Sequence, residues 1–514
     1  MARICLCLTG KTIAQDLDIL EKYRRFVDIA ELRVDCLEAD ERFQIREFPE
    51  LAGLPVILTI RRDMDGGFFK GGEGARISLL SKGLAFAEAD RRHNFAYVDL
   101  EEDLDVPSLE EAARTFGTRI IRSCHNMQGM IDDIPKKLRS LRHVGDEIPK
   151  VAVMPRNLAD VLTLYRVAKE TANINKILIG MGHLGVNTRI LAERLGSFMS
   201  YTSHTGFSFG ANQGDMVQPL DAVLAAPGQL NPQDLAGLYR FREITAKTSL
   251  FGVVGYPLTT TSSPPFFNQV FSEENIDAVY VPFPSDSLDT FLELAEELGL
   301  KGVSVTVPYK EQVLEYLAEE SDRVKSVKAC NTIIASRQGW LGYNTDSQGF
   351  SDSLLAFIGK KDLRGKRITI IGAGGVARAV VAEVFRLKGK ALILNRTVGR
   401  AKRLALPYHF AWGEADSEGS ELMNRYKDII IQTTSVGMAP DVAADPMPDY
   451  KFSGKEVVMD VIYKPEQTRF LARAAEAGCA VLNGQDMLIR QAMYQYRYFM
   501  GSEFPEKLIS RIQI

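Results

Sequence analysis

The stretch APGQLNPQDLAGLYRFREITAKTSLFGVVGYP, residues 226–257, divides this chain into two α/β folds. On its N-terminal side, apolar runs that alternate with helical stretches predict a closed barrel ending in a last helix. Within it, the apolar run Leu250–Val254 predicts the first strand of a different α/β fold. The two sides carry separate sets of polar residues, and we therefore interpret each side by itself.

Length and composition limit the class of protein. A chain of 514 residues is too long for one core, so two to four domains are expected. The net charge of −4 and the lack of a dense Lys/Arg tract argue against nucleic acid as a partner. No apolar run approaches the roughly 18 residues that a membrane span requires. The six cysteines form no C-x-x-C pair, so we expect reduced thiols and no metal. The first strand starts at Arg3, so we expect no targeting peptide and a cytoplasmic location.

Eight short apolar runs precede the boundary, with helical stretches between them such as Ala75–Arg92, Gly129–His143 and Asn157–Thr171. The runs are Arg3–Thr9, Asp28–Asp35, Pro55–Arg61, Phe95–Leu100, Arg119–His125, Lys150–Pro155, Lys176–Gly182 and Phe198–Thr202. Eight strand–helix alternations over about 240 residues are typical of a parallel (β/α)8 TIM barrel. An open doubly wound sheet is the alternative, but eight units in one layer favour closure.

Four of these runs interrupt their apolar pattern with polar side chains. Parallel strands are buried on both faces and are normally almost wholly apolar. One such polar position is usually a structural ion pair, but four strands with polar groups argue for a functional site, because buried charge is costly unless it is paired or used. The positions that share a face within their strand are Glu31, Arg33 and Asp35; Thr59 and Arg61; Ser123 and His125; and Lys150, Ala152 and Met154.

A lysine, a histidine, a carboxylate and several arginines together suit Schiff-base chemistry on a ketone acid. A lysine in a mostly apolar pocket loses its charge, becomes nucleophilic and forms an iminium with a ketone. A nearby histidine then takes a proton from the adjacent carbon and returns it to a leaving hydroxyl, while arginines hold the carboxylate. Dehydration of a β-hydroxy ketone acid fits these residues, and so does a class I aldolase reaction.

The N-terminal half resembles the type I 3-dehydroquinate dehydratases over about 240 residues. The segments that match, in family order, are ELRVD (31–35), LTIRRDMDGG (58–67), IIRSCHN (120–126), IPKVAVMP (148–155), GMGHLGVNTR (180–189) and AAPGQ (225–229). The resemblance implies that Lys150 forms the Schiff base and that His125 is the general acid and base. The substrate-binding residues that it implies are Glu31, Arg33, Arg61, Arg189 and Gln229.

Three features depart from the pattern of that family. Asp65 stands where Glu is usual, and its shorter side chain would orient His125 differently or through water. Ala225 stands where Ser is usual, which removes one hydroxyl from the lid. Extra residues, among them SHTGFSFGANQGDMVQPLD (203–221), suggest a mobile surface loop or, as we hypothesise, an enlarged flap over the barrel mouth.

The C-terminal half carries another series of polar clusters. The hydroxyl cluster TTTSSP (259–264) follows the predicted strand Leu250–Val254, although a polar linker explains that cluster equally well when it is taken alone. GVSVTVPYK (302–310) alternates as a strand with Ser304 and Thr306 on one face. The clusters ACNT (329–332) and GYNTD (342–346) come next.

A glycine turn lies between the predicted strand Arg367–Ile371 and a predicted helix over Val376–Leu387. Its sequence, GAGGVA (372–377), has the G-x-G-x-x-A pattern of a Rossmann dinucleotide site, where glycines let the backbone approach a pyrophosphate at a helix N-terminus. The next strand, Ala391–Leu394, ends at Arg396 and its neighbours and not at an acidic residue. Without a carboxylate for the ribose 2′-hydroxyl, NADP(H) fits better than NAD.

These segments resemble the shikimate dehydrogenases over about 265 residues and in family order, together with NRT (395–397), TTSVGM (433–438), VMDVIY (458–463) and NGQDMLIRQA (483–492). The resemblance implies that Lys310 and Asp346 are the catalytic pair, with Lys310 moving the proton at the carbonyl or hydroxyl oxygen while NADPH delivers hydride. The substrate contacts that it implies are Thr261, Ser263, Thr306, Asn331, Asp346, Tyr463 and Gln491. The cofactor contacts are Gly372, Ala373, Gly374, Gly375, Val376, Ala377, Asn395, Arg396, Thr397, Thr434 and Gly484. Ser304 stands where Asn is usual, so one contact to a ring hydroxyl is lost or bridged by water.

Together the two resemblances predict a bifunctional enzyme of aromatic biosynthesis, which dehydrates 3-dehydroquinate to 3-dehydroshikimate and reduces that product to shikimate with NADPH. The expected domains are the barrel (1–246), a substrate-binding domain (248–345, completed by C-terminal helices 483–514) and a Rossmann NADP-binding domain (346–482). A non-catalytic sensor would have lost Lys150, His125, Lys310 or Asp346, and Arg396 argues against an NAD-dependent quinate/shikimate dehydrogenase. The expected partners are small molecules, and the oligomeric state is left open.

Overall fold

The computed structural model describes residues 1–514 except 86–89, 142–145, 208–224, 259–260, 510 and 512–514. Its described residues group into two compact units, residues 1–300 and residues 301–511. The sequence predicted functional domains with a first boundary near residue 247. The grouping into compact units does not test those limits, which stay a prediction.

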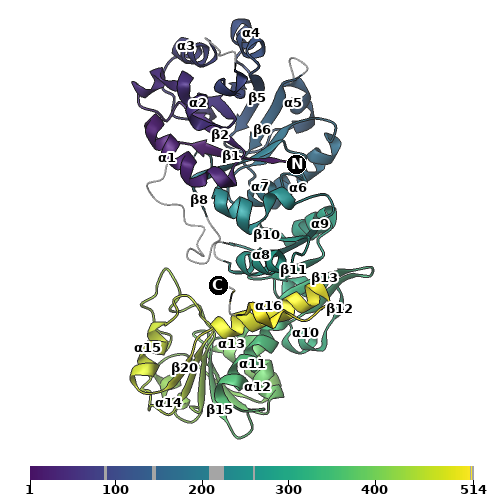
Figure 1. Cartoon of the computed structure of the whole chain (residues 1–514). Helices are drawn as coiled ribbons and strands as arrows, with labels where there is room; N and C mark the ends of the chain where they lie inside the picture. Colours follow the sequence, from purple (N-terminus) through teal and green to yellow (C-terminus); the bar gives the residue numbers. More distant parts are fainter. Residues whose placement is uncertain (86–89, 142–145, 208–224, 259–260, 510, 512–514) are drawn as a thin grey trace. The chain divides into compact units, whose positions relative to one another are not determined.

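An eight-stranded parallel sheet forms the N-terminal part of the first unit (Figure 1). Its strands are β1 (Arg3–Leu8), β2 (Ile29–Arg33), β3 (Val56–Thr59), β4 (Tyr97–Glu101), β5 (Arg119–Asn126), β6 (Ile148–Val153), β7 (Ile177–Gly180) and β8 (Met199–Phe207). β1 pairs with both β2 and β8, and β7 meets β8 through the bridge Lys176–Ser197, which closes the ring. Each predicted apolar run corresponds to one strand, so the prediction of a TIM-type barrel is confirmed.

The helices that cover the barrel are shorter than the sequence suggested. They are α1 (Ile13–Tyr23), α2 (Phe48–Ala52), α3 (Glu73–Leu84), α4 (Pro107–Thr115), α5 (Ile134–Ser140), α6 (Leu158–Glu170) and α7 (Val186–Ile190). The helix expected over Gly129–His143 starts only at Ile134, because the Asp133 side chain caps it by accepting from the Lys136 N–H at 2.9 Å and Pro135 suits a first turn. The helix expected over Ala75–Arg92 ends at Leu84.

Two further expectations for the end of the barrel are corrected. The last helix is only a five-residue π-helix, Asp234–Leu238. Part of the extra segment expected as a loop, Ser203–Phe207, continues β8, while residues 208–221 of that segment lie outside the described residues. The flap hypothesis therefore concerns a shorter stretch than the sequence indicated.

A second, smaller βαβα element completes the first unit. Its parallel strands β9 (Ser249–Gly255) and β10 (Ala278–Pro284) alternate with α8 (Ser263–Glu273) and α9 (Leu288–Leu298). Two arginines attach this element to the barrel: Arg194 donates to the carbonyl of Thr248 at 2.7 Å, and Arg240 donates to the carbonyl of Ala278 at 2.9 Å. The chain between the two elements is thus fixed by hydrogen bonds.

The second unit begins with a small mixed sheet. β11 (Gly302–Val305) and β13 (Thr332–Ser336) are antiparallel, β13 and β14 (Gly339–Tyr343) are antiparallel, and β14 is parallel to β12 (Leu317–Glu320). The helices beside it are α10 (Asp322–Val327), α11 (Thr345–Ile358) and α16 (Gln485–Met500). α11 and α16 approach closely at Gly349, where a Cβ would lie 2.7 Å from the carbonyl oxygen of Met487.

A six-stranded parallel sheet forms the rest of the second unit, with strand order β17-β16-β15-β18-β19-β20. The strands are β15 (Arg367–Ile371), β16 (Lys390–Leu394), β17 (Ala411–Gly413), β18 (Ile429–Gln432), β19 (Val457–Asp460) and β20 (Ala480–Leu482). The helices are α12 (Gly375–Arg386), α13 (Val398–Ala405), α14 (Ser417–Met423) and α15 (Arg469–Glu476). Numbered along the chain, the strands follow the Rossmann order 3-2-1-4-5-6, as the glycine turn predicted.

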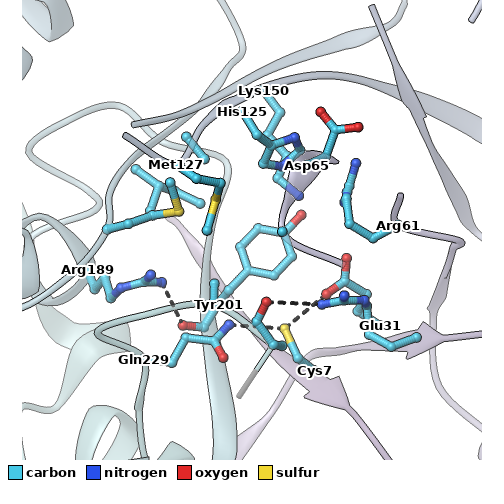
Figure 2. Close-up of a pocket in the computed structure, with 17 residues that line it drawn as sticks. Cys7, Glu31, Arg61, Asp65, His125, Met127, Lys150, Arg189, Tyr201 and Gln229 are labelled. Atoms are coloured by element: carbon cyan, nitrogen blue, oxygen red, sulfur yellow. Dashed lines mark hydrogen bonds between the residues drawn. The ribbon is translucent and has the colours of Figure 1, made fainter. Parts of the chain in front are cut away.

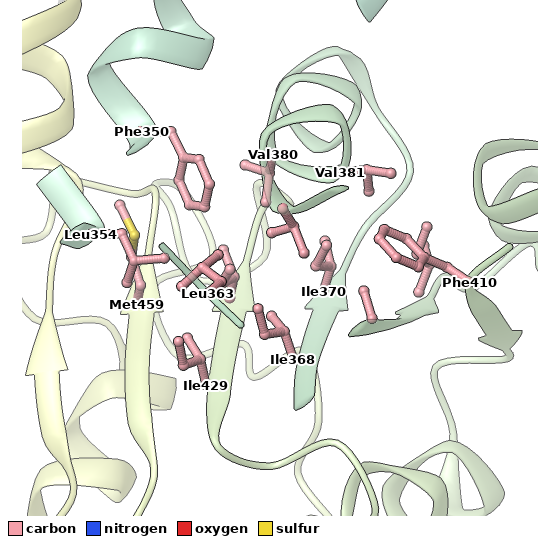
Figure 3. Packing of buried hydrophobic residues seen from close by; sticks show 14 of the residues in the cluster. Phe350, Leu354, Leu363, Ile368, Ile370, Val380, Val381, Phe410, Ile429 and Met459 are labelled. Atoms are coloured by element: carbon pink, nitrogen blue, oxygen red, sulfur yellow. The ribbon is translucent and has the colours of Figure 1, made fainter. Parts of the chain in front are cut away.

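Figure 3 shows the apolar core on one face of this sheet. Ile368 and Ile370 of β15 pack with Val380 of α12 and Leu354 of α11, and all four side chains are fully buried. The same packing fixes the start of α12 at the end of β15, and therefore the position of the glycine turn between them.

Two predictions about the whole chain can be compared with the structure. All six cysteines are free thiols, and four of them are buried, as expected. Among the described residues, no helix has the length and apolar character needed to cross a bilayer.

Replacing Ile370 with alanine should lower the free energy of unfolding of the Rossmann sheet by about 2–5 kcal/mol, because a cavity replaces a fully buried side chain. The measurement is the urea midpoint of the variant compared with wild type. Val442→Ala is the matched control, since Val442 is 49% exposed and should change stability by less than about 0.5 kcal/mol. If both substitutions lowered the free energy of unfolding equally, the burial of Ile370 in this core would be contradicted.

Candidate active sites

A pocket of about 480 Å³ in the barrel collects all seven residues that the sequence predicted for Schiff-base chemistry (Figure 2). Carboxyl ends of parallel strands open at the same end of a barrel, so residues far apart in the sequence meet there. The residues are Glu31 and Arg33 on β2, Arg61 just after β3, His125 on β5, Lys150 on β6, Arg189 on α7 and Gln229 after β8.

Asp99, on β4, carries the negative charge that balances the cations beside this pocket. Its Oδ2 lies 2.8 Å from Lys150 Nζ and 2.8 Å from Arg61 Nη2, and its Oδ1 accepts from Ser123 Oγ at 2.5 Å. Burial by itself would raise the pKa of this carboxyl, but the charges of Arg61 and then Lys150 lower the pKa well below its usual range. Asp99 is therefore an ionised, fully paired anion.

The three predicted substrate arginines have different partners. Arg33 pairs with Asp35 at 2.7 Å, and Arg61 pairs with Glu101 at 2.7 Å in addition to Asp99. Within the part of the chain that the structure describes, Arg189 donates only to carbonyl oxygens, those of Pro227 at 2.9 Å and Tyr201 at 3.3 Å.

Arg189 is consequently the arginine best placed to receive a carboxylate. Among the described residues no carboxylate pairs with it, and its buried Nε has no hydrogen-bond partner. Burial lowers the pKa of its guanidinium to about 10, so it remains charged at neutral pH. A substrate carboxylate would supply the missing anion.

His125 is held as a neutral imidazole. Burial, followed by the charges of Arg61 and Lys150, lowers its pKa well below the usual value. Its Nδ1 is buried and has no hydrogen-bond partner among the described residues. Asp65 lines the same pocket, but its carboxylate pairs with Arg62 at 2.6 Å and not with His125.

Glu31 and Gln229 are connected through a cysteine that the sequence analysis did not single out. Glu31 accepts hydrogen bonds from Thr59 Oγ1 and from Cys7 Sγ, each at 2.9 Å. Gln229 Nε2 donates to the same sulfur at 3.2 Å, which leaves the buried Oε1 of Gln229 without a partner. Cys7 thus positions two predicted substrate-binding side chains.

In the second unit, Lys310 and Asp346 form an ion pair at 2.7 Å. Lys310 lies just beyond β11, and Asp346 lies in the first turn of α11. Asn331 Nδ2 donates to the other Asp346 oxygen at 2.9 Å and to Thr345 Oγ1 at 2.9 Å. The structure therefore brings three of the predicted residues together at one place.

The remaining predicted substrate contacts are distributed around this pair and in the first unit. Gln491, on α16, is buried and accepts from Thr345 Oγ1 at 3.4 Å. Thr306 and Tyr463 are half-buried, just after β11 and just after β19. Thr261 and Ser263 lie in the first unit at the start of α8, where Thr261 Oγ1 accepts from the Ser263 N–H at 3.3 Å, and residues 259–260 of their cluster lie outside the described residues.

Ser304, which stands where Asn was expected, faces α16. Its hydroxyl donates to Gln495 Oε1 at 2.9 Å, and Gln495 Nε2 donates to Thr332 Oγ1 at 2.9 Å. This hydroxyl is therefore engaged with the protein, and the expectation that a ring contact is lost or bridged by water stays a prediction.

The glycine turn has the open backbone that a dinucleotide pyrophosphate requires. Gly372 has a φ of +118°, and a Cβ there would lie 2.4 Å from Thr433 Oγ1, so only glycine fits. A Cβ at Gly374 would meet nothing within 4 Å, and at Gly375 the nearest atom would be Lys310 Cδ at 3.8 Å. The turn, the N-terminus of α12 and the paired Lys310 and Asp346 thus adjoin the same space.

Other predicted cofactor contacts lie at the carboxyl ends of neighbouring strands. Arg396 is exposed after β16 and makes no ion pair with any described residue, while Asn395 Nδ2 donates to the carbonyl of Thr397 at 3.0 Å. Thr434 Oγ1 accepts from the Val436 N–H at 3.1 Å after β18. Gly484 precedes α16, where a Cβ would lie 2.0 Å from the Val461 carbonyl oxygen. These positions fit a 2′-phosphorylated dinucleotide laid across the strand ends.

Three residues in or beside the pocket were not predicted as functional: Cys7 and Tyr201 in its lining, and Asp99, which pairs with Lys150. Asp99 alternates with Glu101 in its strand, which is the same signal that marked the other polar strands and could have found it. Cys7 and Tyr201 also line the pocket, but an isolated cysteine or tyrosine in an apolar strand gives no such signal.

Fold and site together define the class of protein: a chain that joins a Schiff-base-type barrel enzyme to a dinucleotide-dependent oxidoreductase. Family models agree with this division, because Type I 3-dehydroquinase matches residues 4–246 and the shikimate dehydrogenase substrate binding domain matches residues 253–333.

Individual relatives support the same division. The chloroplastic bifunctional 3-dehydroquinate dehydratase/shikimate dehydrogenase of Arabidopsis thaliana is 29% identical over 506 residues, covering 94% of this chain and 79% of the relative. The NADP(+) shikimate dehydrogenase of Caldanaerobacter subterraneus is 34% identical over 274 residues, covering 52% of this chain and 97% of the relative. A crystal structure of shikimate dehydrogenase from Aquifex aeolicus is 32% identical and covers 52% of this chain and 98% of its own, with a TM-score of 0.48. The C-terminal half of the chain belongs to the shikimate dehydrogenase family, and the N-terminal half matches the type I 3-dehydroquinase family model.

The buried neutral state of His125 predicts a pH dependence of stability. Its folded-state pKa lies well below that of a free imidazole, so the unfolded chain takes up the proton first and stability is lost as the pH falls below about 6.5. Between pH 8 and pH 5, the wild type should lose more unfolding free energy than His125→Gln, with the loss starting as the pH falls below about 6.5. Urea unfolding across this range measures the difference, and parallel profiles for the two proteins would contradict the assignment.

Proposed function

We propose that the barrel of this chain dehydrates 3-dehydroquinate to 3-dehydroshikimate and that the second part reduces 3-dehydroshikimate to shikimate with NADPH. The observation that supports the proposal most strongly is the pocket in which Lys150 and the neutral His125 lie with Arg189, a buried cation that lacks an anion. Lys310 and Asp346, paired beside the glycine turn, support the second activity.

The barrel reaction begins at Lys150. Its ammonium group and the ketone of the substrate combine into a protonated Schiff base: a C–N bond forms, and the ketone oxygen leaves as water with two of the nitrogen's protons. Asp99 holds Nζ at 2.8 Å and fixes the direction of attack. This step needs no reactant other than Lys150 and the substrate.

His125 then moves the proton that completes the dehydration. The neutral imidazole takes a proton from the carbon next to the iminium, because the iminium accepts the electron pair. The resulting enamine expels the β-hydroxyl, which leaves as water with the proton returned by His125. Hydrolysis of the product iminium restores Lys150, so that the net change is loss of one water from the substrate.

The polar substituents of the substrate would bind two groups that have unpaired buried atoms among the described residues, Arg189 and Gln229, and the carboxylate of Glu31. Arg189 pairs with the carboxylate, and the free Oε1 of Gln229 accepts from a hydroxyl. Glu31, held by Thr59 and Cys7, accepts from another hydroxyl.

Reduction takes place beside the glycine turn. The bound cofactor supplies the hydride. Lys310 donates a proton to the substrate carbonyl oxygen as that oxygen becomes a hydroxyl, and Asp346 orients Lys310 Nζ through their 2.7 Å contact. Gly374 and Gly375 give the pyrophosphate access to the α12 N-terminus, and Arg396 pairs with the 2′-phosphate.

Supplying 3-dehydroquinate and NADPH together tests both halves at once, because NADPH is consumed only if the first product becomes the second substrate. Lys150→Ala should abolish NADPH consumption from 3-dehydroquinate and leave consumption from 3-dehydroshikimate intact. Lys310→Ala should give the opposite result, with enone absorbance appearing but no NADPH consumed. A Lys150→Ala protein that still dehydrates would exclude the Schiff-base assignment.

Replacing Arg396 with glutamine should raise the KM for NADPH by about 10- to 150-fold, because a charge-assisted contact of about 1.5–3 kcal/mol is removed. The KM for NADH should stay unchanged, since NADH has no 2′-phosphate. Arg403→Gln, an exposed position on α13, serves as the control and should have no effect on either cofactor. Unchanged NADPH kinetics in Arg396→Gln would assign the phosphate to another residue.

A further inference from the structure

Tyr201, on β8, directs a phenol hydroxyl into the barrel pocket where no described residue bonds to it. The side chain lines the pocket and is 4% exposed, and its Oη has no hydrogen-bond partner among the described residues. Its backbone is fixed by the strand register, in which Tyr201 lies opposite Cys5 of β1, and its carbonyl accepts from Arg189 Nη1.

A buried hydroxyl without a partner is unfavourable for the free protein, because it has lost water and gained no hydrogen bond. Tyr165, elsewhere in the barrel, is equally buried, but its hydroxyl donates to Asn187 Oδ1 at 3.1 Å. The difference indicates that the Tyr201 hydroxyl is kept for a ligand and not for the fold.

The ring of Tyr201 also lies against the reactive nitrogen. Lys150 Nζ is 4.4 Å from the ring centroid, over its face. Figure 2 shows the ring crossing the pocket, with Arg189 and Gln229 near one end and Lys150 near the other. A carbon that becomes bonded to Nζ therefore comes to lie beside this ring, and an oxygen on that carbon lies near the hydroxyl at its rim.

The phenol is a donor at neutral pH. Burial, and then the negative charge of Glu31, raise the pKa of Tyr201 well above its usual value. It therefore keeps its proton and does not act as a base.

We propose that the Tyr201 hydroxyl donates a hydrogen bond to the ketone oxygen of the substrate while Lys150 Nζ adds to the ketone carbon. As the C–N bond forms, the carbonyl π pair moves onto oxygen, and the phenol O–H stabilises the charge that develops there. The oxygen then leaves as water with two protons from the lysine nitrogen, and Tyr201 retains its own proton. This inference rests on the proposed Schiff-base function of the barrel.

Tyr201→Phe keeps the ring against Lys150 and removes only the hydroxyl. The variant should lower kcat/KM for dehydration by on the order of 100-fold. The rate at which borohydride traps the substrate adduct should fall by a similar factor. The thermal unfolding midpoint should stay the same or rise, because no hydrogen bond within the described protein is lost. Reduction of 3-dehydroshikimate by the same sample reports that the second unit is folded, and the unfolding midpoint reports on the barrel.

Tyr165→Phe is the matched control, since it removes a buried tyrosine hydroxyl outside the pocket. It should lower the unfolding midpoint and leave kcat/KM for dehydration unchanged. If the wild type formed the adduct and Tyr201→Phe had the same trapping rate and the same kcat/KM, the role of Tyr201 would be wrong and the Schiff-base function would stand. Absence of an adduct on Lys150 in wild type would instead overturn the proposed function of the barrel.

Discussion

The paired carboxylate of Asp99 is the group on which the barrel pocket depends. Two cations, Lys150 and Arg61, lie out of water beside it, and ionised groups are stable there only with an anion and hydrogen bonds. One buried negative charge therefore fixes the reactive nitrogen and the neighbouring guanidinium together. His125 stays neutral for a different reason: burial and the positive charges of Arg61 and Lys150 lower its pKa, although the charge of Asp99 acts in the opposite direction.

Some buried polar groups of the barrel pocket have hydrogen-bond or ion-pair partners among the described residues, and others do not. Arg189, His125, Gln229 and Tyr201 each present a buried polar atom that no described residue satisfies. All four line the same pocket, so a ligand with a carboxylate, hydroxyls and a ketone would complete their hydrogen bonds. In the second unit the same principle holds Lys310 through Asp346, while the glycine turn beside it leaves backbone open for a charged cofactor.

The fold was largely predictable because buried strands appear in the sequence as apolar runs at regular intervals. All eight barrel strands and the strand Arg367–Ile371 follow from apolar runs that parallel strands require on both faces. The limits of the elements were less predictable, since the start of α5 depends on the Asp133 cap, and the end of β8 at Phe207 forms an isolated bridge with Leu230. The alternation of Asp99 with Glu101 was visible in the sequence, but the pairing of Asp99 with Arg61, Ser123 and Lys150 was not, because these partners come from distant parts of the chain.

By itself the sequence determined the two folds, their order, and the residue types that each reaction needs, because these are local properties: periodicity, glycine in a tight turn, and reactive side chains in recognisable segments. Only the tertiary structure decided which of those residues are free to act. Of three predicted substrate arginines, two are neutralised by carboxylates from their own or neighbouring strands, whereas Arg189 pairs with no carboxylate of the described residues. The reason is physical: the state of a buried charge depends on the groups around it, and those groups are assembled from distant parts of the chain.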